Sequence, residues 1–157
     1  SLIRVEADEV TYNLHIFLRF EIERALLDGK VTTAELPELW NQKMEEYLGV
    51  RPQDDADGVL QDVHWASGLI GYFPTYSLGN LLSIQFYDQA VSELPEIPDQ
   101  IAAGEYSSLL GWMRQNIHRP GRKYTPSELV RRCTGEPMRS APYLGYITRK
   151  YGELYGL

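Results

Sequence analysis

The chain has 157 residues and a formal net charge of −7, with 43% hydrophobic and 24% charged residues. This is the composition of one soluble globular domain that can bury a core, and the acidic balance argues against a nucleic-acid partner. The single cysteine, Cys133, excludes an internal disulfide and fits a reducing compartment, so a cytoplasmic protein is expected. No apolar run approaches the roughly 20 residues of a membrane span, so no membrane partner is expected either.

The first helical pattern runs from about residue 8 to residue 28. Asp8 or Thr11 can cap its start, and Gly29 is a natural stop. Apolar side chains recur at every fourth position and further ones widen the stripe: Val10, Leu14, Leu18, Ile22 and Leu26, then Phe17, Phe20, Ala25 and Leu27. A helix that is apolar nearly all round is central to its fold and needs neighbours on several sides.

A second helix is predicted from Thr32 or Thr33 to about Leu48, with Gly49 as its stop. The polar loop 51–57 that follows contains three aspartates, but it lacks the alternating ligands, central glycine and closing glutamate of a calcium loop. Asp55 or Asp57 is therefore expected to cap a short turn.

The second half of the chain also has helical patterns, and no strand pattern interrupts them. The expected helices are 77–94, 99–103, 106–118, 126–132 and one that starts at residue 141 or 142. In the last helix five side chains are expected to face inward: Leu144, Ile147, Tyr151, Leu154 and Tyr155. The predicted fold class is all-α.

The stretch 58–76 carries most of the functional signal. It reads GVLQDVHWASGLIGYFPTY, and its glycines and proline predict a loop rich in aromatic and hydrogen-bonding side chains. The chain has three histidines, and none has a second histidine four residues later. His15 lies in the apolar helix and is expected to be a core side chain, and His118 lies at a helix end. His64, beside Gln61 and Asp62, is the functional candidate.

Two short motifs give this sequence a family resemblance. The segment 58–65, GVLQDVHW, resembles the GxxQDxHW motif of the thermostable zinc carboxypeptidases of the Taq type, and 3–8, IRVEAD, resembles their IRxxAD motif. The runs GYFPTYSLGNL and YLGYITRKYGELY are similar to the closing region of that family. The resemblance covers essentially the whole chain.

In that family an HExxH helix and a later glutamate hold the zinc, and both precede the IRxxAD motif. The resemblance therefore implies that residues 1–157 are a single helical C-terminal region of a larger zinc carboxypeptidase. The implied fold is a neurolysin-like, zincin-like helical metallopeptidase fold. The zinc would belong to the missing N-terminal part, and this chain would bind no metal. The parent enzyme would remove single residues from peptide C-termini, and the isolated chain is expected to be inactive.

Peptide hydrolysis of this kind defines two tasks for the chain. The attacked carbonyl becomes an oxyanion that needs a positioned donor, and the C-terminal carboxylate of the substrate needs a cationic or multi-donor clamp. By resemblance, His64 and Tyr76 are the catalytic candidates, although Tyr72 and Tyr76 are both candidate phenols and which of them contacts the oxyanion stays open. Arg4, Gln61 and Tyr72 are the substrate-binding candidates, with Gln61 as the carboxylate clamp.

Supporting roles are expected for three further residues, Asp8, Asp62 and Trp65. Two arrangements remain open for the first motif: Arg4 can pair with Asp8, four residues away, or it can orient Gln61 and Asp62.

A second interpretation assigns the chain no catalytic role. The chain would be a free-standing helical interaction module with a catalytically dead aromatic groove, and an upstream HExxH sequence would decide against this. The expected partners under the first interpretation are a peptide C-terminus and the N-terminal part of the same enzyme. The broad apolar helix also predicts either cover by that part or self-association, for example as a homodimer.

Overall fold

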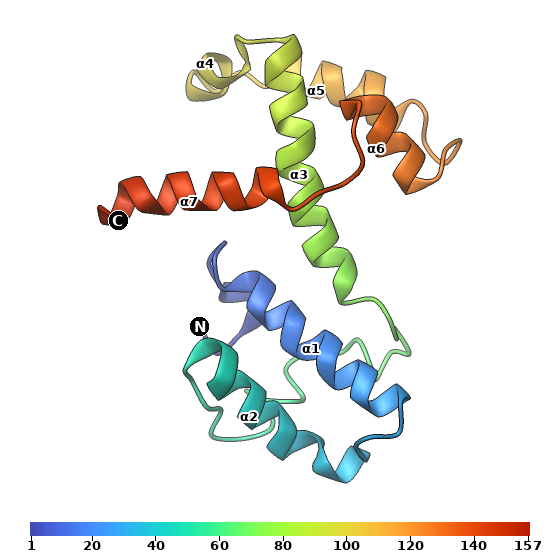
Figure 1. Cartoon of the computed structure of the whole chain (residues 1–157), viewed down its shortest axis with the longest axis vertical. Coiled ribbons are helices and arrows are strands. Elements are labelled where there is room, and N and C mark those ends of the chain that lie inside the picture. Colours follow the sequence, from blue (N-terminus) through green and yellow to red (C-terminus); the bar gives the residue numbers. More distant parts are fainter. The chain divides into compact units, whose positions relative to one another are not determined.

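The computed structural model describes residues 1–157, and every regular element in it is a helix (Figure 1). The all-α prediction is therefore confirmed. Two compact units divide the chain, Ser1–Leu78 and Gly79–Leu157, and each is described by itself. The expectation of one single region stays a prediction. None of the helices combines the length and apolar character needed to cross a membrane.

The first unit begins with a short 3-10 turn, η1 (Arg4–Glu6), and the helix α1 (Tyr12–Leu27). The carboxylate of Asp8 accepts hydrogen bonds from the backbone N–H groups of Val10 and Thr11, at 2.8 and 2.9 Å. These bonds satisfy backbone donors just ahead of the helix, where no carbonyl of the preceding turn is available. Asp8 thus has a structural role at the start of α1, and it does not pair with Arg4.

The helix α2 (Leu36–Leu48) follows a second 3-10 turn, η2 (Thr33–Glu35). Thr32 and Glu35 form a capping box, in which the Glu35 carboxylate accepts the Thr32 N–H at 2.8 Å. Gly49 ends the helix with a φ of 66°, a conformation that glycine adopts without strain. In the next loop Asp54, and not the expected Asp55 or Asp57, caps the turn: its carboxylate accepts the Asp57 N–H at 3.0 Å.

The helices α1 and α2 pack side by side in opposite directions, and the core of the first unit lies between them (Figure 1). Leu18 and Ile22 of α1 meet Trp40 and Met44 of α2, and all four side chains are almost completely buried. Other apolar side chains of α1 remain exposed: Phe17, Phe20 and Leu27. The stripe on α1 is thus wider than the surface that α2 covers.

The long helix α3 (Pro74–Glu93) begins three residues before the predicted start at Ser77. Proline is favoured in the first turn of a helix, where its missing N–H costs nothing. As a consequence Tyr76 lies on a helix and not in a loop.

The second unit contains the rest of α3 and five further elements: α4 (Ile97–Ala102), α5 (Ser107–Met113), the π-helical turn η3 (Arg114–His118), α6 (Pro126–Thr134) and α7 (Ala141–Tyr155). Its core contains Ala90, Ile97, Trp112 and Cys133. The side chain of Gln85 is buried in α3. It donates to the Pro137 carbonyl at 3.0 Å and accepts the Arg139 N–H at 3.2 Å, so it holds the turn before α7.

The prediction for α7 was wrong for three of its five side chains. Leu144, Leu154 and Tyr155 are 58–68% exposed, whereas the buried residue is Tyr143. Leu154 lies on the same side of α7 as Tyr143, three turns further along, yet it is exposed, whereas Ile147 and Tyr151 between them are half-buried. Burial along this side therefore decreases from the start of the helix toward its end.

Candidate functional site

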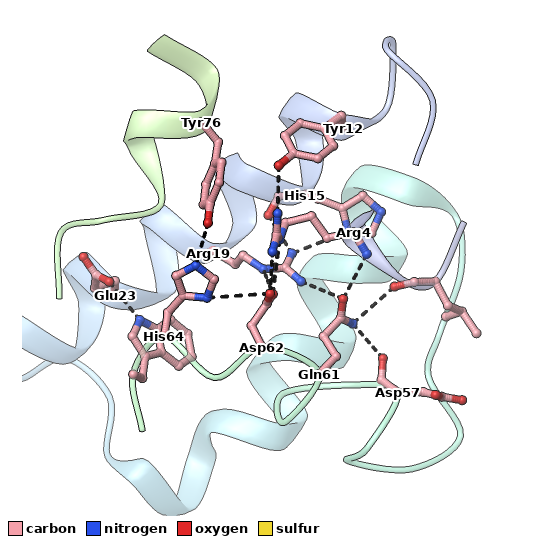
Figure 2. Close-up of polar contacts among 12 residues, drawn as sticks. Arg4, Tyr12, His15, Arg19, Glu23, Asp57, Gln61, Asp62, His64 and Tyr76 are labelled. Carbon is pink, nitrogen blue, oxygen red and sulfur yellow. Dashed lines mark hydrogen bonds and ion pairs between the residues drawn. The ribbon is translucent and has the colours of Figure 1, made fainter. Parts of the chain in front are cut away.

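The two sequence motifs meet in the first unit and form one polar cluster (Figure 2). The backbone N–H of Arg4 donates to the Gln61 side-chain oxygen at 3.1 Å. The Arg4 guanidinium forms an ion pair with Asp62, with 2.7 Å between Nη2 and Oδ1 and 3.2 Å between Nε and the same oxygen. Of the two open arrangements, Arg4 therefore adopts the one that orients Gln61 and Asp62.

A second arginine, from the middle of α1, joins the same cluster. Arg19 Nε lies 2.7 Å from the other Asp62 oxygen, and Arg19 Nη2 donates to the Gln61 oxygen at 2.7 Å. Arg19 is completely buried. Burial lowers the pKa of its guanidinium to about 10 against the opposing attraction of Asp62, so it remains charged at neutral pH.

The carboxylate of Asp62 is shared between the two arginines. Burial raises the pKa of Asp62, but the hydrogen bonds and charges of Arg4 and Arg19 outweigh it and hold that pKa below its ordinary value. Asp62 is consequently ionised over the physiological range. Asp62, two positions before His64, is thus bound to η1 through Arg4 and to α1 through Arg19.

Gln61 makes every hydrogen bond that its amide can make. Its oxygen accepts from Arg4 and Arg19, and its nitrogen donates to the carbonyls of Leu2 at 3.2 Å and Asp57 at 2.7 Å. No donor is left for a substrate carboxylate. The expectation that Gln61 clamps the substrate carboxylate therefore conflicts with these contacts.

The guanidinium of Arg4 is likewise committed to the protein. Beyond Asp62, its Nη1 donates to the Tyr12 hydroxyl at 2.7 Å, and the guanidinium carbon lies 4.8 Å from the centre of the Tyr76 ring. The side chain is buried. Three of the five N–H groups of the guanidinium are used in these contacts, so Arg4, unlike Gln61, keeps donors, and its burial limits their access to a substrate.

His64 and Tyr76 lie together, as catalytic partners would. The distance between His64 Nε2 and the Tyr76 hydroxyl is 2.9 Å. The imidazole packs on Phe73, with 4.4 Å between ring centres, and Tyr72 and Tyr76 flank it at 5.7 and 5.8 Å. His64 is 8% exposed and Tyr72 is 43% exposed, so this aromatic cluster extends from the interior to the surface.

The second ring nitrogen of His64 faces the buried carboxylate. His64 Nδ1 lies 3.7 Å from Asp62 Oδ1 and has no hydrogen-bond partner. An N–H at Nδ1 would be attracted by Asp62, whereas a lone pair there would be repelled. Asp62 therefore favours the tautomer in which Nδ1 carries the proton and Nε2 accepts from Tyr76.

Trp65 and the loop after it are held by a carboxylate from α1. Glu23 is 4% exposed, and its two oxygens accept the indole N–H of Trp65 at 2.8 Å and the backbone N–H of Gly71 at 2.6 Å. The Trp65 ring also packs edge-on against Trp40 and Phe73. The loop between His64 and Tyr72 is thus fastened at both of its ends.

Sequence reasoning missed the part that α1 plays in this site. His15, Arg19 and Glu23 are spaced by four residues and form one polar line along a mostly apolar helix. His15 is completely buried, as expected for a core side chain, and its Nδ1 lies 3.4 Å from Arg19 Nη1. Polar residues repeated at a helical spacing inside an apolar stripe were the available signal.

The residues of this chain do not fit a zinc site. No group of three or more histidine, cysteine, aspartate or glutamate side chains is arranged to hold a metal ion. The orphaned nitrogen of His64 has one carboxylate near it, and that carboxylate already pairs with two arginines. A structural or catalytic zinc ion needs three or four protein ligands.

Comparison with known proteins gives this arrangement a context, and it is that of a metallopeptidase. The chain belongs to the carboxypeptidase Taq (M32) metallopeptidase family, whose model matches residues 1–151. Thermostable carboxypeptidase 1 of Thermus thermophilus is 53% identical to it over 156 residues, and carboxypeptidase 1 of Bacillus subtilis is 43% identical over 155. Each alignment covers 99% of this chain but only 31% of the relative.

Solved structures of the family have the same fold as this chain. The crystal structure of the M32 carboxypeptidase from Deinococcus radiodurans R1 matches with a TM-score of 0.95 and 49% identity, over 100% of this chain and 32% of that one. Metallocarboxypeptidase 1 of Trypanosoma cruzi matches with a TM-score of 0.91 and 42% identity, over 96% of this chain and 31% of that one. The family resemblance and the helical metallopeptidase fold are therefore confirmed.

Proposed function

We propose that this chain is the C-terminal, substrate-facing part of a zinc-dependent carboxypeptidase that removes single residues from peptide C-termini. Family membership and the names of the relatives support the class of enzyme. The observation that carries the role of this chain is the hydrogen-bonded pair of His64 and Tyr76, fastened to α1 by Asp62 and extending to the surface.

The pair can serve an oxyanion in one of its two hydrogen-bond arrangements. When His64 Nε2 accepts from Tyr76, the phenol proton is occupied. When Nε2 carries a proton and donates to the phenol oxygen, the Tyr76 O–H is free to donate to a substrate carbonyl. In this proposal the second arrangement is the imidazolium, in which Nδ1–H faces Asp62 and Nε2–H, whose proton comes from solvent, donates to the phenol oxygen. The Tyr76 O–H then donates a hydrogen bond to the substrate carbonyl as that carbonyl gains negative charge, and the proton stays on the phenol.

The other candidates receive revised roles on the basis of their contacts. Gln61 and Asp62 are positioning residues, because their polar groups are used inside the protein. Arg4 is assigned the same role, because its side chain is buried and bound to Asp62 and Tyr12. Glu23 and Trp65 hold the loop that follows His64. Tyr72 is the substrate contact, since it is exposed next to Tyr76, with 5.5 Å between the ring centres.

Zinc enters this proposal as a cofactor of the complete enzyme, held by residues outside 1–157. The partner of this chain would then be the remaining part of the same enzyme, and the isolated chain would have no peptidase activity. Residues 1–157 alone, supplied with zinc or cobalt, should release no C-terminal amino acid. Turnover that a chelator abolishes would contradict this division of labour.

The test of the pair uses the complete enzyme and the variants Tyr76→Phe and His64→Ala. Each removes a donor needed most when charge develops, so kcat should fall by about 10²–10³ while KM changes little. Tyr72→Phe is the comparison variant: it removes a neighbouring phenol oxygen at the proposed substrate contact, so it should raise KM and leave kcat nearly unchanged. If both test variants keep the kcat of the unsubstituted enzyme, the aromatic cluster has only a packing role. The alternative function, a catalytically dead interaction module, would then be favoured.

A further inference from the structure

The second unit contains a hollow that is lined by positively charged side chains, although the chain as a whole has a negative net charge. It has a volume of about 360 Å³ and lies among η3, the following loop and α6. Hollows of about 300–1,000 Å³ are typical of small-molecule sites. The site proposed for peptide chemistry consists of residues of the first unit, and none of them lines this hollow.

Positive charge is concentrated around it. Residues 114–132 contain six arginines and lysines and one acidic residue, in a chain with 15 basic and 22 acidic residues overall. Three of these cations line the hollow, namely Arg119, Lys123 and Arg132. The acidic residue is Glu128, whose carboxylate is used in the capping box of α6, where it accepts the Thr125 N–H at 2.8 Å.

None of the three cations has a carboxylate partner within ion-pair distance. Arg132 lies over the ring of Tyr124, 4.3 Å from its centre, and Arg119 donates to the Gln115 side chain at 3.0 Å. Lys123 lies beside the same tyrosine, 5.5 Å from the ring centre. Unlike Arg4 and Arg19, which pair with Asp62, these three cations form no ion pair, although Glu128 interacts electrostatically with Arg132 over a longer distance.

We propose that this hollow binds a small phosphorylated molecule. Two guanidinium forks and one ammonium around one space match a group with more than one negative charge and several acceptor oxygens, which is a phosphate more than a carboxylate. The half-buried Tyr124 and Leu129 provide apolar surface for the organic part of the ligand. The acidic charge of the whole chain disfavours a nucleic acid or an anionic membrane as the source of the phosphate.

The cysteine of this chain provides a local reporter. Cys133 lines the hollow, is buried, and donates its thiol to the Asn116 carbonyl at 3.2 Å. Burial raises the pKa of this thiol, so its alkylation is governed by access and slow opening. A ligand in the hollow should slow that reaction further.

The experiment uses the complete protein in a phosphate-free buffer, with orthophosphate and phenyl phosphate as probes. Alkylation of Cys133 by a neutral reagent is followed by peptide mapping, and binding is measured by calorimetry. Saturable binding that slows alkylation is expected. Arg119→Gln and Arg132→Gln should each weaken binding about 10- to 100-fold, because each removes charge-assisted hydrogen bonds.

The control is Arg131→Gln, which makes the same charge change in α6 at a residue that does not line the hollow. It should leave the affinity within about twofold. Equal losses in Arg131→Gln and Arg132→Gln, no saturable protection by either probe, or protection by duplex DNA or a phosphoserine peptide alone would each overturn the proposal. All three arginines are exposed, and Lys123→Gln in the exposed loop provides a further variant that leaves both helices untouched.

Discussion

Glu23→Gln tests whether the buried carboxylate holds the loop that carries the aromatic cluster. The carboxylate has two oxygens and accepts one N–H on each, from Trp65 at 2.8 Å and Gly71 at 2.6 Å. A glutamine of the same size offers one oxygen, so one of the two donors would face an NH₂ group. Loss of a hydrogen bond to a charged group, with a buried donor left unpaired, costs about 2–3 kcal/mol.

The expected result has a stability part and an activity part. The free energy of unfolding of the complete enzyme, measured by urea denaturation with circular dichroism, should fall by about 2–3 kcal/mol. Because His64 directly precedes Trp65 and Tyr72 directly follows Gly71, kcat should fall as well, even at low temperature where the variant is folded. Partial loss of kcat without loss of secondary structure would identify Glu23 as a positioning residue.

Glu21→Gln is the matched control for this experiment. Glu21 lies on the same helix and also accepts a side-chain hydrogen bond, from Tyr47 at 2.6 Å, but it is exposed. Exposed pairs contribute about 0–1 kcal/mol, so this variant should change stability little and activity not at all. Equal effects of the two substitutions would refute the reasoning, because they would show that the contacts of Glu23 with the loop carry no special energy.

Two further predictions concern the polar cluster. Gln61→Ala leaves the backbone N–H of Arg4 and the Nη2 donor of Arg19 without an acceptor, so it should lower the free energy of unfolding by roughly 2–4 kcal/mol. The KM of the folded enzyme should stay constant. A higher KM with unchanged stability would instead support Gln61 as the clamp for the substrate carboxylate. Burial and the neighbouring Arg19 lower the pKa of His15 from 6.5 to about 4, so the unfolded chain binds the proton more readily and stability is lost as pH falls from about 6.5 to 4. That loss should reach about 3 kcal/mol in urea titrations at several pH values, and His15→Gln should remove this part of the pH dependence.

The helices whose ends carry strong local signals were predicted well from the sequence. Thr32, one of the two predicted helix starts, forms a capping box with Glu35 ahead of α2, and the predicted stop Gly49 ends that helix in the left-handed conformation. These signals act within a few residues, so no knowledge of the rest of the fold is needed. The start of α3 was missed because the aromatic run around Pro74 resembles a loop more than a helix.

Which side of a helix would be covered could not be predicted. The apolar residues expected to face inward lie on one broad side of α7, and local periodicity does not say how much of that side meets the rest of the chain. Tyr143 is buried and Leu144 is exposed, although the two are neighbours of similar apolar character. The answer depends on contacts between distant segments, and these leave no local trace in the sequence.

The candidate site was predicted in part, for a similar reason. His64 and Tyr76 were both named as catalytic candidates by resemblance, and the short stretch between them allows the contact that the structure shows. The ion pair between Arg4 and Asp62 connects residues that are 58 positions apart in the sequence, and Asp62 also pairs with Arg19 of α1. Such a three-way contact follows from tertiary packing alone.

The buried ion cluster is better explained by orientation than by stability. Placing two guanidinium groups and one carboxylate in the interior has a large desolvation cost, and well-packed apolar side chains of the same volume are often as stable or more so. An apolar replacement, however, would remove the only charge that faces the Nδ1 side of the His64 ring. With Arg4 on one oxygen and Arg19 on the other, the Asp62 carboxylate cannot rotate, and its Oδ1 stays 3.7 Å from His64 Nδ1. That fixed charge favours the tautomer in which Nδ1 carries the proton and the Nε2 lone pair faces the Tyr76 hydroxyl. The buried ion cluster therefore gives the His64–Tyr76 pair one defined hydrogen-bond arrangement before substrate binds, and this offsets its desolvation cost.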